Sequence, residues 1–149
     1  MGHQTYLATD GGLGIKDDAS TFHPGLEARP IQAIAAGKDG TLWEGRNGDT
    51  LVHLDPASGR RREWVMAPMS SIQPQPDGTV WVSTGRGLYR VEDHEGAPSQ
   101  PALSSPADLS ITDMAVDSDG TVWLTGNGCL WRRRPDGTRS EEHTSELQS

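Results

Sequence analysis

A seven-residue motif that occurs three times constrains the fold of this chain more than any other feature. The copies read K-D-G-T-L-W-E at 38–44, P-D-G-T-V-W-V at 76–82 and S-D-G-T-V-W-L at 118–124. Tyr6 takes the place of the tryptophan in a fourth, partial copy, and the aromatic positions follow one another after 37, 38 and 42 residues. A period of about 40 residues predicts a repeat protein in which each repeat forms one supersecondary unit.

Each repeat consists of short strand-like segments separated by turns. The apolar stretch I-Q-A-I-A-A at 31–36 precedes the motif, and the β-branched and aromatic residues of T-V-W-V favour a second strand. Asp-Gly predicts the hairpin turn between them, because glycine adopts positive φ freely and aspartate tolerates it. Further turns at 85–87 and 93–96 separate a third and a fourth strand. The repeat therefore predicts four antiparallel strands, with no helix start signal.

Four antiparallel strands per repeat are typical of a β-propeller blade. We predict an all-β fold, a partial β-propeller of about three and a half four-stranded antiparallel blades. The predicted blade units are 1–29, 30–67, 68–109 and 110–138. We interpret the repeated motif as scaffold, with its aromatic ring between adjacent blades. The scaffold residues are Asp39, Gly40, Trp43, Asp77, Gly78, Trp81, Asp119, Gly120 and Trp123.

A metal site at the motif is the alternative interpretation of its aspartates. Calcium takes about six to eight oxygen ligands, and one aspartate per hairpin supplies too few. The Asp-box of sialidases has the order S-x-D-x-G-x-x-W, whereas Asp and Gly are adjacent here. We therefore predict no metal site and no cofactor. The single cysteine, Cys129, cannot form an internal disulfide, and we interpret it as a strand residue rather than a nucleophile.

Two segments resemble known propeller families. The pattern I-x-x-I-x-x-x-x-D-G-T-L-W, followed by a glycine-rich turn and G-L-Y-R-V, resembles the repeats of two-component regulator propellers. That resemblance implies an extracytoplasmic sensor domain of a bacterial signalling protein, which binds a small molecule, an oligosaccharide or a protein on its rim. The segment L-V-H-L-D-P-A-S-G-R-R-R-E-W at 51–64 resembles virginiamycin B lyase-like propellers. A fragment of such an enzyme, or a purely structural interaction platform, are the alternative functions.

Function in a propeller is expected on the rim formed by the turns from second to third strand and by the connections between blades. Alignment of the repeats places six polar residues there: Asp10, Arg46, Asn47, Asp49, Arg86 and Asn127. Arg46 and Arg86, interpreted as equivalent turn residues, fit a carboxylate or a sulfate, because a guanidinium offers two parallel donors. The alternative is that all six are solvated turn residues.

The ionisable residues predict no catalytic site in this chain. The densest group is Glu92-Asp93-His94-Glu95, which falls in the third turn of its repeat, on the rim opposite the expected site. We interpret it as a solvated turn. The sequence shows no Ser/His/Asp or H-E-x-x-H arrangement. The five histidines are His3, His23, His53, His94 and His143.

Charge and hydropathy limit the partners. The net charge of −8 argues against nucleic acid, which requires a basic face, although Arg60–Arg62 and Arg132–Arg134 form two short basic runs. No stretch of about 18 apolar residues is present that could cross a membrane. Residues 1–20 lack the pattern of a secretory signal. We expect a periplasmic or extracytoplasmic location if the sensor resemblance holds.

The C-terminal end of the chain is expected to be unnatural, and the first repeat is expected either to be completed by missing C-terminal sequence or to be truncated at its start. Residues 139–149, R-S-E-E-H-T-S-E-L-Q-S, resemble the translation of a common short-read sequencing adapter, which predicts a non-native tail after Thr138. The repeat that contains Tyr6 lacks its first strand. Open strand edges and uncovered apolar faces then predict poor solubility or marginal folding for the chain by itself.

Overall fold

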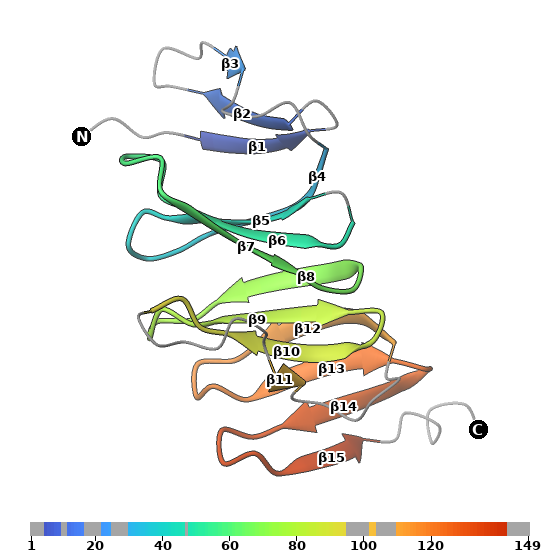
Figure 1. Ribbon diagram of the computed structural model, residues 1–149. Helices are drawn as coiled ribbons and strands as arrows, with labels where there is room; N and C mark the ends of the chain where they lie inside the picture. Colours follow the sequence, from blue (N-terminus) through green and yellow to red (C-terminus); the bar gives the residue numbers. More distant parts are fainter. Residues whose placement is uncertain are drawn as a thin grey trace.

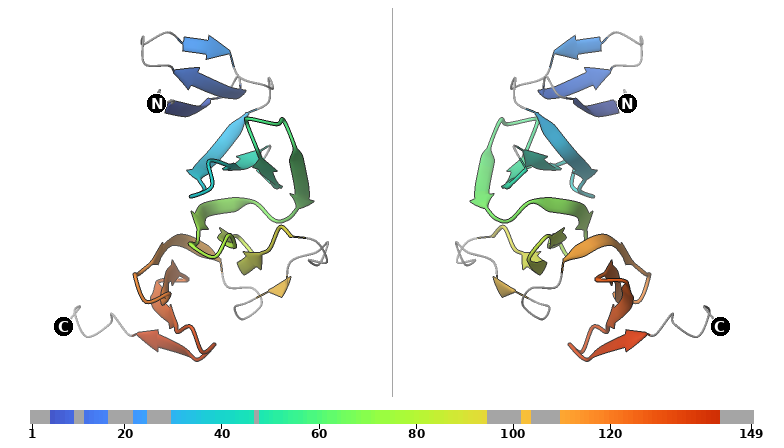
Figure 2. Two further views of the ribbon diagram at one scale, coloured as in Figure 1. Left: turned by 90° about the vertical axis from the view of Figure 1, so that its left-hand side faces the viewer. Right: turned by 90° about the vertical axis from the view of Figure 1, so that its right-hand side faces the viewer.

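The computed structural model describes residues 5–9, 12–16, 22–24, 30–46, 48–94, 102–103 and 110–142. These residues form fifteen strands and no helix, grouped in four antiparallel sheets that we call blades 1 to 4. No helix of the described residues is long and apolar enough to cross a membrane. The predicted all-β architecture is confirmed. Figure 1 shows the sheets stacked in chain order, with blades 1 and 4 at opposite ends, and Figure 2 shows the same succession from two sides.

Each blade is a meander in which strands that are consecutive in sequence pair with one another. Blade 1 has three strands, β1 (Thr5–Thr9), β2 (Gly12–Lys16) and β3 (Phe22–Pro24). Blade 2 consists of β4 (Ile31–Ala36), β5 (Leu42–Arg46), β6 (Thr50–Leu54) and β7 (Arg61–Val65). Blade 3 consists of β8 (Met69–Pro74), β9 (Val80–Thr84), β10 (Gly87–Val91) and β11 (Ala102–Leu103). Blade 4 consists of β12 (Ile111–Val116), β13 (Val122–Gly126), β14 (Cys129–Arg133) and β15 (Arg139–Glu142).

The first part of the predicted tail takes part in blade 4. Arg139–Glu142 forms the outer strand β15 and pairs with β14. An outer strand is held through its backbone, which requires no particular side chains, so its pairing says nothing about the origin of the segment. The resemblance to translated adapter sequence therefore stays a prediction. Residues 143–149 lie outside the described residues.

The Asp-Gly-Thr turns join the first to the second strand of blades 2, 3 and 4. Gly40 has φ 81°, and Asp39 Oδ1 accepts hydrogen bonds from the backbone N–H of Thr41 (3.1 Å) and from its hydroxyl (2.5 Å). The glycine alone therefore takes the left-handed conformation, and the aspartate acts through its side chain. That corrects our expectation that the aspartate is chosen for its tolerance of positive φ. Equivalent bonds to the threonine N–H occur at Asp77, Asp119 and Asp136.

The motif tryptophans form the core between blades. Trp43 is 2% exposed and packs against residues of its own blade, such as Trp64, and against Val80 and Val82 of blade 3. Trp81 packs in the same way against Met114, Val122 and Leu124 of blade 4. Trp43 and Trp81 therefore each pack against the next blade, whereas Trp123 of blade 4 is half-buried. The apolar layers between sheets, rather than the sheets alone, therefore hold the repeats together.

Candidate functional site

The predicted site lies on what we call the loop rim, formed by the turns from second to third strand and by the connections between blades. The connection from blade 2 to blade 3 is held there by backbone hydrogen bonds to turns on both sides. Met66 N–H donates to Asp49 O (2.7 Å), Met69 N–H to Gly48 O (3.1 Å), and Gly85 N–H to Pro68 O (3.0 Å). Because these donors and acceptors are paired with one another, the backbone of this connection is fixed against the turns beside it.

Arg46 is not a free rim residue. It ends strand β5 and is 2% exposed, and its Nε lies 2.6 Å from Glu44 Oε2, which belongs to a side chain with no exposed surface. The strand register makes it equivalent to the buried Thr84, not to Arg86. Our interpretation of two arginines in equivalent turns is therefore wrong, because the longer turn of blade 2 shifts the alignment after the tryptophan. Glu44 already supplies the carboxylate that we expected from a ligand.

The other described rim residues are exposed and differ from blade to blade. Arg86 lies in the two-residue turn of blade 3, where its N–H donates to Thr84 Oγ1 (3.0 Å). Asn127 occupies the same turn of blade 4 with φ 52°, a conformation that asparagine adopts more readily than most residues. Asp49 accepts a hydrogen bond from the hydroxyl of Thr50 (3.0 Å). Asp10 and Asn47 lie outside the described residues, so their place on this rim stays a prediction.

The sequence comparison missed three polar residues on the same rim. The first strands β4, β8 and β12 each have a β-bulge at their second residue, which is Gln32, Ser70 or Thr112. Gln32 Oε1 accepts from Gly48 N–H (3.0 Å), and the Ser70 hydroxyl donates to Ile111 O of the next blade (3.0 Å). A polar residue at this aligned position of all three apolar strands is a signal that was present in the sequence. Bulges of this kind redirect side chains at sheet ends and beside sites.

The opposite rim, which we call the motif rim, carries the Asp-Gly-Thr turns and the turns from third to fourth strand. His53 of blade 2 is stacked on Trp43, with ring centroids 3.8 Å apart. Its Nδ1 lies 2.6 Å from Oδ2 of Asp93, which belongs to blade 3, and its Nε2 lies 2.8 Å from Thr41 Oγ1. Arg62 donates to the other oxygen of Asp93 (3.0 Å). These contacts form a polar clasp across two blades.

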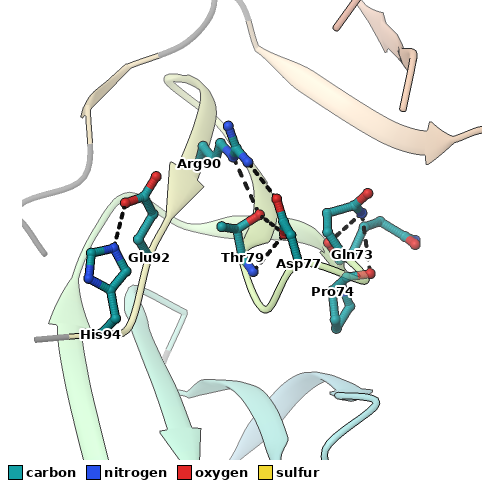
Figure 3. A network of polar contacts seen from close by, with 8 residues as sticks. Gln73, Pro74, Asp77, Thr79, Arg90, Glu92 and His94 are labelled. Atoms are coloured by element: carbon teal, nitrogen blue, oxygen red, sulfur yellow. Dashed lines mark hydrogen bonds and ion pairs between the residues drawn. The ribbon is translucent and has the colours of Figure 1, made fainter. Parts of the chain in front are cut away.

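Asp93 departs from the expected solvated turn. Its side chain is 12% exposed. Burial works to raise the pKa of Asp93, but hydrogen bonds from His53 and Arg62 outweigh it and hold the pKa below its usual value. The neighbouring Glu92 and His94 do lie at the surface, with His94 Nε2 at 3.0 Å from Glu92 Oε2 (Figure 3). The contact between His53 and Asp93 joins residues 40 positions apart, one repeat length, and is therefore invisible to a search for local motifs.

Thr41, His53 and Asp93 are joined in the order of a hydrolase triad, an arrangement that the sequence did not reveal. The hydroxyl of Thr41 lies 2.5 Å from Asp39 Oδ1, and this hydrogen bond is the main reason that the pKa of Asp39 is lowered. Because a carboxylate can only accept, the threonine proton points to Asp39. A nucleophile would instead donate to the histidine. The described residues contain no group of three or more metal-ligating side chains.

Hollows on the motif rim follow the seams between blades. The seam between blades 2 and 3 holds a space of about 80 Å³ beside Thr41, Trp43 and His53. The seam between blades 3 and 4 holds about 450 Å³ beside Trp81 and Arg90. A third hollow of about 200 Å³ lies over His53 and the basic run at 60–62. The motif rim, which the sequence suggested was inert, therefore offers space for a ligand.

Comparisons with known proteins agree with this architecture. Residues 105–128 match the two-component regulator propeller family, and this segment contains the third copy of the motif. The photosystem II assembly lipoprotein Ycf48 of Prochlorococcus marinus is 26% identical over 145 residues. That alignment covers 92% of this chain and 41% of the relative, so the chain spans about two fifths of its length.

Solved structures show the fold directly. Virginiamycin B lyase of Staphylococcus aureus superimposes with a TM-score of 0.67 at 13% identity, covering 95% of this chain and 59% of the enzyme. The extracellular domain of BT4673, assigned as a one-component system of B. thetaiotaomicron, gives 0.70 at 14% identity over 89% of this chain and 19% of that domain. The WD40 β-propeller domain of Doa1 superimposes with a TM-score of 0.67 at 17% identity, covering 98% of this chain and 49% of that domain. The chain thus has the β-propeller fold, and its residues 105–128 match the two-component regulator propeller family, as its sequence predicted.

Proposed function

We propose that this chain contributes blades to an extracytoplasmic sensor propeller that binds a ligand or a protein partner on its loop rim. The observation that supports the proposal is the contrast between a fixed rim backbone and varied exposed side chains. Hydrogen bonds hold the connection between blades 2 and 3 against the turns on both sides of it, whereas Asp49, Arg86 and Asn127 differ in charge and shape. Rigid elements that present variable side chains are the usual construction of a binding surface.

The family match supports the sensor role over the other candidates. Residues 105–128 match a family of two-component regulators, and similar structures include the extracellular domain of a one-component system. The likeness to virginiamycin B lyase extends to the fold alone. We propose no catalytic role, because the triad-like group on the motif rim directs its hydroxyl proton to Asp39.

A ligand screen by thermal shift tests the proposal. Small organic acids and oligosaccharides are screened against the native chain and a triple variant, Asp49→Asn, Arg86→Ala and Asn127→Gly. Glycine is chosen at 127 because it adopts the positive φ of this turn without strain. A compound that binds the loop rim stabilises the native chain but not the triple variant. The control variant Lys38→Ala changes an exposed residue of the motif rim and retains the effect.

Retention of every ligand effect in the triple variant would contradict binding at the loop rim. A second candidate function is a platform for protein assembly, favoured by the alignment with Ycf48 across 92% of this chain. It is distinguished by cross-linking through a cysteine placed at position 86, after Cys129 has been replaced by serine. Specific capture of a protein by that variant, without any small-molecule stabilisation, favours the platform over the sensor.

A further inference from the structure

The two seams on the motif rim are built from aligned positions that hold different residues. In each blade, the motif tryptophan of the second strand pairs with a residue of the third strand. That residue is His53 in blade 2 and Arg90 in blade 3. The other side of each seam is formed by the third strand of the following blade. Its last residue is Val91 in β10 and Arg133 in β14, and each of the two pairs with a valine. Two residues further along, Asp93 of blade 3 corresponds to Pro135 of blade 4. The seam between blades 2 and 3 therefore has a carboxylate where the seam between blades 3 and 4 has none.

Asp93 shows what a carboxylate does in such a seam. It reaches from blade 3 to blade 2, with one oxygen at 2.6 Å from His53 and the other at 3.0 Å from Arg62. The apolar Val91 lies behind it against Trp43, in the core between the two blades. A carboxylate of the chain thus bridges two basic side chains over a tryptophan, and the space left in this seam is about 80 Å³.

The seam between blades 3 and 4 also has two basic side chains, here one from each blade, but no carboxylate at the position of Asp93. The guanidinium groups of Arg90 and Arg133 lie 5.7 Å and 4.9 Å from the ring centre of Trp81, one from each blade. Arg90 is paired with Asp77 at 2.7 Å (Figure 3). The guanidinium of Arg133 makes no hydrogen bond or ion pair with the residues that the structure describes, and Asp136 acts on it only through its charge. Burial, then the charges of the neighbouring Arg139 and Arg90, lower the pKa of Arg133, and the charge of Asp136 works against them.

The hollow beside Arg133 is large enough for a small organic molecule. Its volume of about 450 Å³ contrasts with about 80 Å³ in the bridged seam, and it is within the usual range of ligand pockets. Trp81, Pro76 and Pro135 give it an apolar lining. Two guanidinium groups repel each other, and Pro135, at the position that aligns with Asp93, supplies no carboxylate between them. The missing element is therefore a carboxylate.

We propose that the seam between blades 3 and 4 is a binding site for a small monocarboxylate with an apolar body, whose carboxylate binds Arg133 as Asp93 binds its basic partners. A guanidinium binds a carboxylate through two parallel hydrogen bonds, and the indole and the two prolines contact the apolar part. Three aspartates also line the hollow, namely Asp77, Asp117 and Asp119. Their charges favour a monocarboxylate over a dianion. This site is separate from the loop rim and does not depend on the function proposed there.

Benzoate is a suitable probe, with benzamide as its uncharged analogue. The indole N–H resonance of Trp81 is followed by NMR in the native chain during titration with each compound, and is assigned with a Trp81→Phe variant. We expect a saturable shift with benzoate and none with benzamide. Arg133→Gln weakens benzoate binding by about tenfold, the usual effect of losing hydrogen bonds to a charged group. Arg134→Gln removes the same charge from an exposed neighbour and serves as the matched control.

A second variant keeps the proposal testable if Arg133→Gln disturbs the packing on Trp81. Pro135→Asp installs the carboxylate that blade 3 has at Asp93, which should raise the unfolding midpoint and abolish benzoate binding. The proposal is overturned if benzoate gives no saturable shift, if benzamide binds equally well, or if binding survives in both Arg133→Gln and Pro135→Asp. A change at the loop rim, such as Arg86→Ala, leaves this binding unchanged, so the two proposed sites are tested independently.

Discussion

The buried pair between Glu44 and Arg46 gives the sharpest prediction about stability. Both side chains lie on the face of blade 2 that carries Leu42 and Val52, and they are 0% and 2% exposed. Glu44 Oε1 is buried without a hydrogen-bond partner, so this carboxylate depends on Arg46 for its charge balance. Replacement of Arg46 by alanine leaves a charge in an apolar layer.

The expected magnitude follows from the burial of both partners. Removal of one member of a buried ion pair costs about 3–5 kcal/mol, because the remaining charge stays desolvated. The double variant Glu44→Val and Arg46→Thr instead installs the residues that blade 3 has at the aligned positions, Val82 and Thr84. Replacement of a whole buried pair by packed residues is often neutral or stabilising by about 1–4 kcal/mol. The double variant should therefore be more stable than the single one.

Urea unfolding at neutral pH, followed by tryptophan fluorescence, measures these free energies of unfolding. Arg86→Ala is the control, because it removes an exposed arginine from the adjacent turn position of blade 3 and should change stability by about 0.5 kcal/mol or less. The reasoning is refuted if Arg46→Ala costs no more than that control. It is also refuted if the double variant is as unstable as Arg46→Ala, since the penalty would then not come from an unpaired carboxylate.

Two further predictions concern single positions. A Cβ on Gly126 would lie 2.3 Å from the backbone oxygen of Ser110, so Gly126→Ala should destabilise by about 1–3 kcal/mol in urea unfolding. Gly85→Ala should not destabilise the chain in this way, because nothing lies within 4 Å of the added Cβ. Equal losses of stability in the two variants would contradict the clash at Gly126. The hydrogen bonds from His53 and Arg62 hold the pKa of Asp93 below the unfolded value of about 3.9. The Asp93 carboxylate therefore stabilises the fold at pH values above about 3.9, and this contribution is lost as the pH falls through the folded-state pKa. The stability difference between the native chain and Asp93→Asn should therefore shrink as the pH falls below about 4, and a difference that stays constant down to about pH 3 would contradict it.

Much of the fold could be predicted because the same turn and strand pattern occurs several times in the sequence. One Asp-Gly-Thr segment is weak evidence for a turn, but three copies in register fix the strand that follows and the side of the sheet on which each tryptophan lies. The chemical reason for the aspartate could not be predicted in the same way. The sequence is compatible both with an aspartate in the left-handed conformation and with an aspartate whose side chain accepts hydrogen bonds from Thr41. Only the backbone conformation distinguishes the two.

The candidate site was less predictable because turn lengths differ between blades. One extra residue in the turn after β5 made Arg46 and Arg86 look equivalent, although the strand pairing places Arg46 inside the sheet. Alignment by identical letters cannot detect this shift, because the turn residues differ between blades and offer no identical letters to align. The clasp between His53 and Asp93 was missed for a related reason, since each residue is unremarkable in its own repeat.

These failures indicate where a repeat protein can change its chemistry without changing its fold. The seams are held by buried residues such as Trp43 and Trp81, so the polar residues above them are not needed to keep the blades together. One seam can then be closed by Asp93 while the next is left open at Pro135. A difference of one carboxylate at aligned positions changes a clasp into a candidate pocket. In a chain of this kind, departures from the repeat at buried or half-buried polar positions are therefore better guides to function than the repeated motif itself.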